Sequence, residues 1–333
     1  MKHAILRIAK AFGAFRCSRY LTRRATRILC YHGTWLGADR FRGDALFMQA
    51  TTFHARLDYL ATNGYTVVSL EALVSSRNQG GGLPDASVVI TIDDGWYSTF
   101  ADMLPALRKH AFPATMYCDT RHLVTGGPLP HMMAQYFLRI AGATNLQEPT
   151  AALLQKALAP DLSREERMAA ALAFGQEIGI DATPYLARRV FEYMTPDELK
   201  EFAASPGCSV QLHTHRHTMG DHSAESLHQE VADNREALSR LLGQPADSFE
   251  HFCYPSGVFS QSAAEHLRQL GIASATSTQQ GIAFPSADIM LLPRILDGEN
   301  LSILEFEAEI SGFMHLLRTI TGRCRIGYDA PFS

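Results

Sequence analysis

Two adjacent carboxylates, Asp93 and Asp94, come directly after an uninterrupted β-branched run (88–92), and Gly95 follows them. Such a run is typical of a strand that is buried on both faces of a parallel sheet. Sites in α/β sheets and barrels are built at the carboxyl ends of such strands. Asp and Gly are also common turn residues, so the triplet alone is equally compatible with a surface turn.

A second cluster shifts the balance toward a site. His213, His215 and His217 lie within five positions of one another, after the short run 210–212. Imidazoles this close repel each other when protonated, and such clusters are more typical of metal sites than of solvated loops. One carboxylate and two neutral imidazoles bind a divalent metal and leave positions for water and substrate. The two stretches together favour a hydrolytic metal site.

The elements that must position these residues alternate between strands and helices. Strands are predicted over 27–32, 66–70, 88–92, 113–118, 249–254 and 273–277, and helices over 53–60, 97–110, 224–242, 262–270 and 301–317. This order indicates right-handed βαβ units and an α/β fold with a parallel sheet or barrel. The first strand ends at His32, which would then lie on the same rim as Asp93.

The composition indicates a soluble globular chain with a large core, since 46% of its residues are hydrophobic. A net charge of -4 does not suggest nucleic acid as a partner. The six cysteines are scattered without a C-x-x-C pair, which favours a reducing compartment over a disulfide framework.

Residues 1–27 predict a basic amphipathic helix, because Ile5, Ile8, Phe12 and Phe15 recur at helical spacing and no acidic residue precedes Asp39. The cations of this segment are Lys2, Arg7, Lys10, Arg16, Arg19, Arg23, Arg24 and Arg27. Such a helix either packs on its own domain, which is the commoner arrangement, or lies on an anionic membrane surface.

The same segment has neither the unbroken apolar stretch nor the cleavage site of a signal peptide, and it is too short and too charged to span a bilayer. We therefore expect a cytoplasmic protein, which would be peripheral at the inner membrane surface if the segment binds lipid. The tail 319–333 is basic and otherwise uninformative.

Three motifs in order resemble those of the polysaccharide deacetylases, the NodB-homology group or carbohydrate esterase family 4. Residues 91–95 (TIDDG) resemble the first motif, 213–217 (HTHRH) the second and 252–257 (FCYPSG) the third. Residues 28–33 and 292–295 also fit, so the resemblance covers roughly 28–313. It implies a distorted (β/α) barrel over 28–318.

The family core would need only a short connection before its last helices, so the helical region of about 131–190 is interpreted as an inserted subdomain. Ser163 and Glu166 form a capping box within it. Thr195 and Pro196 open a further helix. The insertion would shape a substrate groove, which His131 would line, or form an oligomer contact.

The resemblance assigns the roles in the site. Asp94, His213 and His217 would bind one divalent metal, for which zinc fits and cobalt, nickel or iron are alternatives. Asp93 would be the general base. The backbone N–H of Tyr254 would stabilise the oxyanion, on a turn shaped by Pro255 and Gly257.

The sequence departs from the common family pattern at two places. Many members carry an arginine before the third motif, where this chain has Cys253, and Arg294 is the candidate that replaces it. The late Leu-x-His motif that supplies the general acid is not evident either. The pair at 31–32 resembles the permuted poly-N-acetylglucosamine deacetylases, which makes His32 the candidate acid, with His215 as its competitor and as a substrate contact.

The predicted function is metal-dependent removal of an N-acetyl group from an amino sugar in a polysaccharide, a glycolipid or their precursor, as in bacterial exopolysaccharide biosynthesis. Trp96 would stack on a sugar ring, although ordinary packing at a helix start explains it equally well. The alternatives are a deformylase or another C–N hydrolase of the superfamily, and a catalytically silent carbohydrate-binding relative.

Overall fold

The computed structural model describes residues 2–39, 46–142, 145–220 and 223–321. Its centre is a closed barrel of seven parallel strands in the order β1-β4-β5-β6-β7-β8-β9, and β9 pairs back to β1. The predicted (β/α) barrel is therefore confirmed. The strands are β1 (Arg27–Tyr31), β4 (Val88–Asp94), β5 (Ala114–Cys118), β6 (Cys208–Leu212), β7 (His251–Cys253), β8 (Ser274–Gln280) and β9 (Leu292–Leu296).

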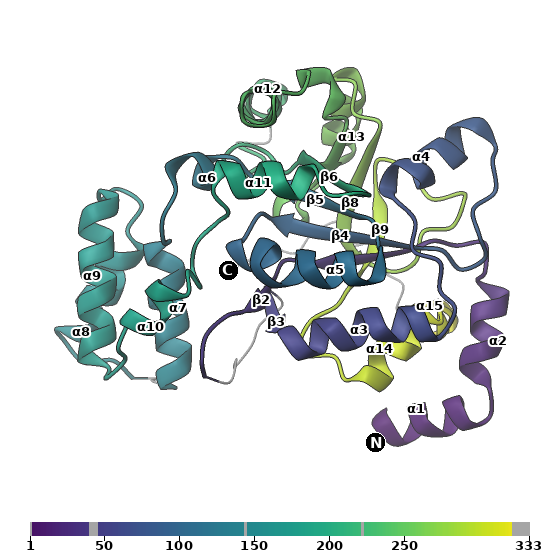
Figure 1. Ribbon diagram of the computed structural model, residues 1–333, viewed down its shortest axis with the longest axis horizontal. Helices are drawn as coiled ribbons and strands as arrows, with labels where there is room; N and C mark the ends of the chain where they lie inside the picture. The colour runs from purple at the N-terminus through teal and green to yellow at the C-terminus, as the bar shows by residue number, and fades with distance from the viewer. Residues whose placement is uncertain (1, 40–45, 143–144, 221–222, 322–333) are drawn as a thin grey trace.

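Helices surround this barrel (Figure 1). They are α3 (Ala50–Thr62), α4 (Leu70–Gln79), α5 (Leu104–His110), α11 (Pro196–Ala203), α12 (Ala224–Leu242), α13 (Gln261–Gln269), α14 (Ile303–Ile310) and α15 (Phe313–Ile320). The structure also contains the short helical turns η1 (Thr99–Met103), η2 (Ala246–Ser248) and η3 (Pro255–Gly257). A separate two-stranded sheet consists of β2 (Gly33–Trp35) and β3 (Phe47–Gln49).

Strand β4 is buried along its whole length, as its β-branched sequence predicts. Alternation along the strand places Val89, Thr91 and Asp93 on one face. Arg294 of β9 donates hydrogen bonds to both Thr91 and Asp93, so this face points into the barrel. The interior is thus apolar around Val89 and becomes polar at the carboxyl ends of the strands.

The described residues between β5 and α11 include the helices α6 (Arg121–Thr125), α7 (Pro130–Ala141), α8 (Thr150–Leu158), α9 (Arg164–Glu177) and α10 (Thr183–Ala187). Figure 1 shows α7–α10 as a lobe beside the barrel. The predicted capping box at Ser163 opens α9, and the helix predicted to begin at Thr195 and Pro196 is α11, which also has a capping box. The lobe shares a hydrophobic cluster with Trp35 and Phe47, which joins it to the barrel.

Three predicted elements differ from the structure. The segment 66–70 is not a strand, since it makes only one bridge to β4 and Ser69 caps α4. The N-terminal segment forms two helices, α1 (Lys2–Ala11) and α2 (Ala14–Leu21), because Gly13 adopts a left-handed φ of 77°. The last helix is divided at Gly312 (φ 79°), where a Cβ would lie 2.5 Å from Thr22 Oγ1.

In the ranges that the structure describes, no helix has the length and apolar character needed to cross a membrane. Five cysteines are free thiols there, and Cys324 lies outside those ranges.

Candidate active site

The adjacent carboxylates Asp93 and Asp94 are the last residues of β4, and both are buried. Asp94 has a φ of 76°, in the left-handed region that residues other than glycine rarely adopt. Such backbone strain persists only where the surrounding structure fixes the residue. The segment that follows the helical lobe fixes the turn after Asp94. Its Met194 N–H donates to Gly95 O at 3.0 Å, and its Glu192 O accepts from Tyr97 N–H at 2.9 Å.

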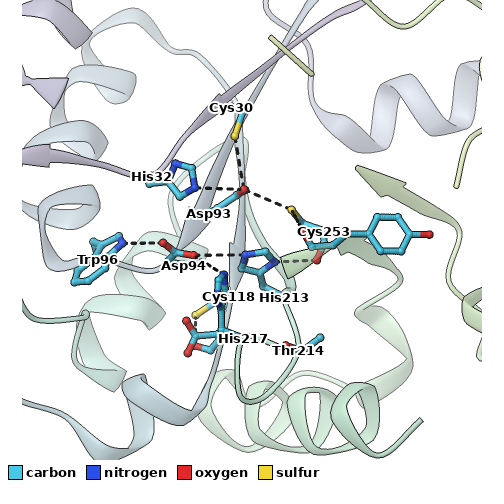
Figure 2. Close-up of polar contacts among 12 residues, drawn as sticks. Cys30, His32, Asp93, Asp94, Trp96, Cys118, His213, Thr214, His217 and Cys253 are labelled. Carbon is cyan, nitrogen blue, oxygen red and sulfur yellow. Dashed lines mark hydrogen bonds and ion pairs between the residues drawn. The ribbon is translucent and has the colours of Figure 1, made fainter. Parts of the chain in front are cut away.

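Two imidazoles face one oxygen of Asp94, as Figure 2 shows. The Nε2 atoms of His213 and His217 each lie 3.5 Å from Oδ1 of Asp94. This oxygen is buried and has no hydrogen-bond partner among the described residues. The three ligand atoms lie within 4.8 Å of one another. An unsatisfied buried carboxylate oxygen that faces two imidazole nitrogens fits a divalent cation.

Hydrogen bonds behind these three side chains fix their orientation. His213 Nδ1 donates to Cys253 O at 2.8 Å, which turns Nε2 toward Asp94. Trp96 Nε1 donates to the second carboxylate oxygen of Asp94 at 2.9 Å. Both contacts have the character of the outer-shell partners that support metal ligands.

The protonation states of the cluster bear on metal binding. Burial raises the pKa of Asp94, but His213, His32 and His217 outweigh it and lower that pKa overall. Burial, with His213 nearby, lowers the pKa of His217 to about 4. The pKa of His213 is raised, because Cys253 and Asp94 outweigh its burial. Metal binding requires the neutral imidazole, so a raised pKa of His213 makes metal affinity fall as the pH is lowered.

Helix α12 holds the loop that carries the histidines. Asn234, which is fully buried, accepts the His213 N–H at 3.0 Å. Glu230 accepts the N–H groups of His215 and Arg216 at 3.0 and 2.9 Å. These bonds stabilise a loop in which His217 has a left-handed φ of 54°.

Asp93 is paired with Arg294. The guanidinium Nη1 lies 2.8 Å from Oδ1, and Nη2 lies 2.7 Å from Oδ2. Burial raises the pKa of Asp93, but Arg294 outweighs it and the pKa falls to about 2. Asp93 is therefore ionised throughout the physiological range. Cys253 Sγ lies 3.2 Å from Nη2, so a small side chain at the position of the missing motif arginine leaves room for Arg294.

His32 follows β1 and faces the same carboxylate. Its Nε2 lies 3.9 Å from Asp93 Oδ2, and its side chain is 22% exposed. Its Nδ1 is buried and lacks a partner among the described residues. His32 therefore lies between the carboxylate and solvent.

The proposed ligands, the pair of Asp93 with Arg294, and His32 face one cavity of about 450 Å³. The described residues that line it are Cys30, His32, Leu46, Asp93, Asp94, His213, His217, Tyr254, Ser256, Thr278, Arg294, Leu296, Asp297 and Asn300. Another cavity, of about 470 Å³, lies near the start of β1 and is lined by Arg23, Arg24 and Arg77 but by no histidine in the described part of the chain. The chemistry therefore belongs to the first cavity.

The predicted oxyanion donor requires a correction. The N–H of Tyr254 donates to Thr276 O at 3.1 Å, as part of the barrel sheet, and is not free for substrate. Ser256 lines the cavity two residues later, with a left-handed φ of 54°. Pro255 has no N–H and the Gly257 N–H donates to Tyr254 O, so the Ser256 N–H is the candidate backbone donor of this turn.

The remaining predicted substrate contacts do not line the cavity. Trp96 is 2% exposed and packs on Tyr193 with ring centroids 4.6 Å apart, so it is not a free stacking platform. His215 is turned toward Thr120 Oγ1 at 2.8 Å. Pro255 is buried, and Gly257 shapes the turn because a Cβ there would overlap Thr278 Oγ1.

Several lining residues were missed by sequence reasoning, and Asp297 is the most informative. It directly follows β9, as Asp94 ends β4, so the rule of polar residues at strand ends could have found it. Its carboxylate accepts from Arg56 at 3.0 Å and from Tyr31 at 3.1 Å. Ser256 lies within the third motif, and Leu46, Thr278, Leu296 and Asn300 carry no such signal.

Comparisons with known proteins find similarity to polysaccharide deacetylases. The family described as "Polysaccharide deacetylase" matches residues 156–275. The chain is 23% identical over 292 residues to the poly-beta-1,6-N-acetyl-D-glucosamine N-deacetylase of Escherichia coli strain K12. That match covers 83% of this chain but only 38% of the relative, so the chain spans well under half of the relative's length.

Solved structures share the fold. A Streptococcus pyogenes deacetylase, PplD, in complex with acetate matches with a TM-score of 0.58 and 18% identity, over 86% of this chain and 98% of that one. IcaB from Ammonifex degensii matches with a TM-score of 0.56 and 19% identity, over 86% and 97% of the two chains.

Proposed function

Because this chain is related to the polysaccharide deacetylases, we propose that it is a metal-dependent hydrolase that removes the N-acetyl group from an amino sugar. The observation that supports this most is that one cavity holds both the cluster of Asp94, His213 and His217 and the carboxylate of Asp93 paired with Arg294. A site for a cation beside a separate ionised carboxylate suits metal-assisted hydrolysis of an amide by water.

Asp94, His213 and His217 would hold the metal. When bound, a divalent ion would lower the pKa of a water molecule and polarise the amide carbonyl. Zinc suits one carboxylate and two imidazoles, and cobalt, nickel and iron are the alternatives for the same ligands.

Asp93 would act as the general base and accept a proton from the attacking water. The water oxygen bonds to the carbonyl carbon, the C–N bond then breaks, and the products are acetate and the free amine. Arg294 fixes the direction of the carboxylate through two bonds and keeps it ionised. The N–H of Ser256 would donate to the oxyanion in place of Tyr254.

His32 would be the general acid that protonates the departing nitrogen. Its Nε2 faces Asp93 across 3.9 Å, and its position beside the cavity puts it within reach of a leaving group there. His215, the other candidate, bonds to Thr120 outside the cavity, which supports His32.

We propose that the substrate is an N-acetylated polysaccharide, glycolipid or precursor, such as one made in exopolysaccharide biosynthesis. The helices α7–α10 would be an inserted subdomain whose returning chain braces the turn after Asp94 and limits one side of the substrate groove. A cytoplasmic place of action stays a prediction, which fractionation of cells with an antibody against the chain would check.

The direct test is product analysis on a panel of substrates. Oligomers of β-1,6-linked N-acetylglucosamine, chitin oligomers, N-acetyl monosaccharides and an N-formyl amino sugar would be incubated with the metal-loaded protein. We expect acetate from at least one N-acetylated sugar. Formate released only from the N-formyl sugar would support the deformylase alternative, and tight binding without any product would support a silent carbohydrate-binding relative.

A further inference from the structure

The apolar stripe of α1 does not face its own domain. Ile5 and Ile8 are 55% and 58% exposed, and Phe12, whose N–H continues the helical turn by donating to Ile8 O at 3.0 Å, is 87% exposed. With 3.6 residues per turn, these three side chains fall within an arc of about 60°. They therefore form one outward stripe, which we call the α1 stripe.

The inward face of α1 carries the charges instead. Leu6 is its one buried side chain, and Lys2, His3 and Lys10 lie on the same face at helical spacings of three and four. Lys2 pairs with Glu305 at 2.7 Å, His3 faces Glu305 at 3.3 Å, and Lys10 pairs with Glu307. Leu6 also packs into an apolar cluster with Phe15 and Ala308. Ion pairs and this contact thus hold α1 on α14 while Ile5, Ile8 and Phe12 point away, so α1 leaves its larger apolar stripe uncovered by its own domain.

Exposed apolar side chains are concentrated in this part of the molecule. Of the eleven large hydrophobic residues that are exposed in the described ranges, Ile5, Ile8, Phe12, Tyr20, Leu21, Ile303, Leu317 and Ile320 belong to α1, α2, α14, α15 or the turn between α1 and α2. Helix α1 contacts α14, and α2 contacts both α14 and α15. Scattered apolar residues need no explanation, but a contiguous group points to a binding surface.

The positive charge of the N-terminal segment indicates which kind of partner covers the α1 stripe. No acidic residue occurs before Asp39, and Arg7, Arg16 and Arg24 are exposed with no acidic partner in the part of the chain that the structure describes. An apolar stripe on an N-terminal segment that also carries unpaired cations complements an anionic lipid surface, where the side chains enter the interface and the cations meet headgroup phosphates.

We propose that α1 and α2 form a docking surface for an anionic bilayer, with Ile5, Ile8 and Phe12 inserted at the headgroup boundary. Because the inward ion pairs already hold α1 in place, the helix is ordered before it meets lipid, and binding needs no refolding of the segment. This inference does not rest on deacetylase activity.

The test uses the whole chain and vesicles that contain phosphatidylglycerol in phosphatidylcholine, at low salt, with sedimentation as the readout. Wild type should bind these vesicles and should not bind phosphatidylcholine alone. The double variant Ile8→Ser with Phe12→Ser should lower the partition coefficient by about tenfold or more. Leu172→Ser, which removes an exposed leucine of α9, is the matched control and should bind as wild type does.

A second variant and a depth probe check the orientation. Arg7→Gln with Arg16→Gln should weaken binding and reduce its salt dependence. A tryptophan placed by Phe12→Trp should shift to shorter emission wavelength with vesicles and be quenched by brominated lipid.

Absence of wild-type binding, or equal binding by the stripe variant, would overturn the proposal. If wild type is a dimer, the stripe variant is a monomer and neither binds vesicles, the α1 stripe contacts a second copy of the chain. That result would also overturn the proposal. Acetate release from a soluble substrate should be the same in wild type and in the stripe variant, so failure here is separable from failure of the proposed reaction.

Discussion

The guanidinium of Arg294 and the carboxylate of Asp93 form two parallel N–H···O bonds across the barrel interior, at 2.8 and 2.7 Å. Arg294 comes from β9 and Asp93 from β4, and β1 separates these strands in the barrel. Both side chains are almost completely buried. The pair therefore both keeps the proposed base ionised and links two strands on either side of β1.

Replacement of Arg294 by methionine should affect both stability and the pH profile. The pKa of Asp93, about 2, lies below its usual 3.8, so the pair stabilises the fold above about pH 3.8 and this contribution is lost as the pH falls toward 2. Without the arginine, burial raises the pKa of Asp93. We expect the free energy of unfolding at neutral pH to fall by about 3–5 kcal/mol, and the acid limb of kcat/KM to move to higher pH.

Urea unfolding and a pH–rate profile would measure these two effects. Arg268→Met is the control, because Arg268 pairs with Asp288 on the surface and should contribute under about 1 kcal/mol. An unchanged acid limb in Arg294→Met would exclude the role assigned to Arg294.

The Trp96→Phe variant tests the support of the metal ligands. It keeps a ring against Tyr193 but removes the N–H that bonds to Asp94 at 2.9 Å. Outer-shell substitutions of this kind lower metal affinity by about 10–100-fold, which competition with a chromophoric chelator would measure. The control is Trp35→Phe, since Trp35 donates to Asp39 O instead of a site residue. Equal metal affinity in the two variants would contradict this role for Trp96.

His32→Gln and His215→Gln separate the two candidate acids. Loss of a general acid lowers kcat by about 10²–10⁴-fold, and we expect this for His32→Gln with metal still bound. His215→Gln should lose little, because its ring bonds to Thr120 outside the cavity. Steady-state kinetics at matched metal content would decide, and the reverse pattern would transfer the role to His215.

Removal of the metal should abolish activity without unfolding the barrel, because the ligands lie on strands and loops held by Asn234, Glu230 and Trp96. Dialysis against a chelator, followed by zinc, cobalt, nickel or iron(II), would rank the ions by restored turnover. Each ion that binds should raise the melting temperature, by a stabilisation that grows with its free concentration relative to its Kd. Full activity in metal-free protein would contradict the site.

The barrel was predictable because its signals are local. The β-branched run before Asp93 and the capping boxes at Ser163 and Thr195 each specify one element through their own side chains, and the structure contains all three. The predicted strand at 66–70 was wrong because its β-branched run of three residues is short and Ser69 caps α4 instead.

The site was only partly predictable, because contacts across the barrel depend on tertiary packing. The motif positions indicated that Asp94, His213 and His217 belong together, and the structure places their ligand atoms in one cluster. No local pattern could show that the Tyr254 N–H is used by the sheet, or that Trp96 is buried against Asp94. The outward stripe of α1 was also beyond prediction, since spacing defines a stripe but not the direction that it faces.

The central claim is that Asp93 is the base and Asp94, His213 and His217 hold the metal. The most direct test is to measure bound metal and released acetate together for wild type and Asp93→Asn, after circular dichroism has shown both to be folded. We predict about one metal per chain in both proteins and acetate from wild type alone. Acetate release by Asp93→Asn at the wild-type rate, or a wild type that binds no metal after reloading, would contradict the account.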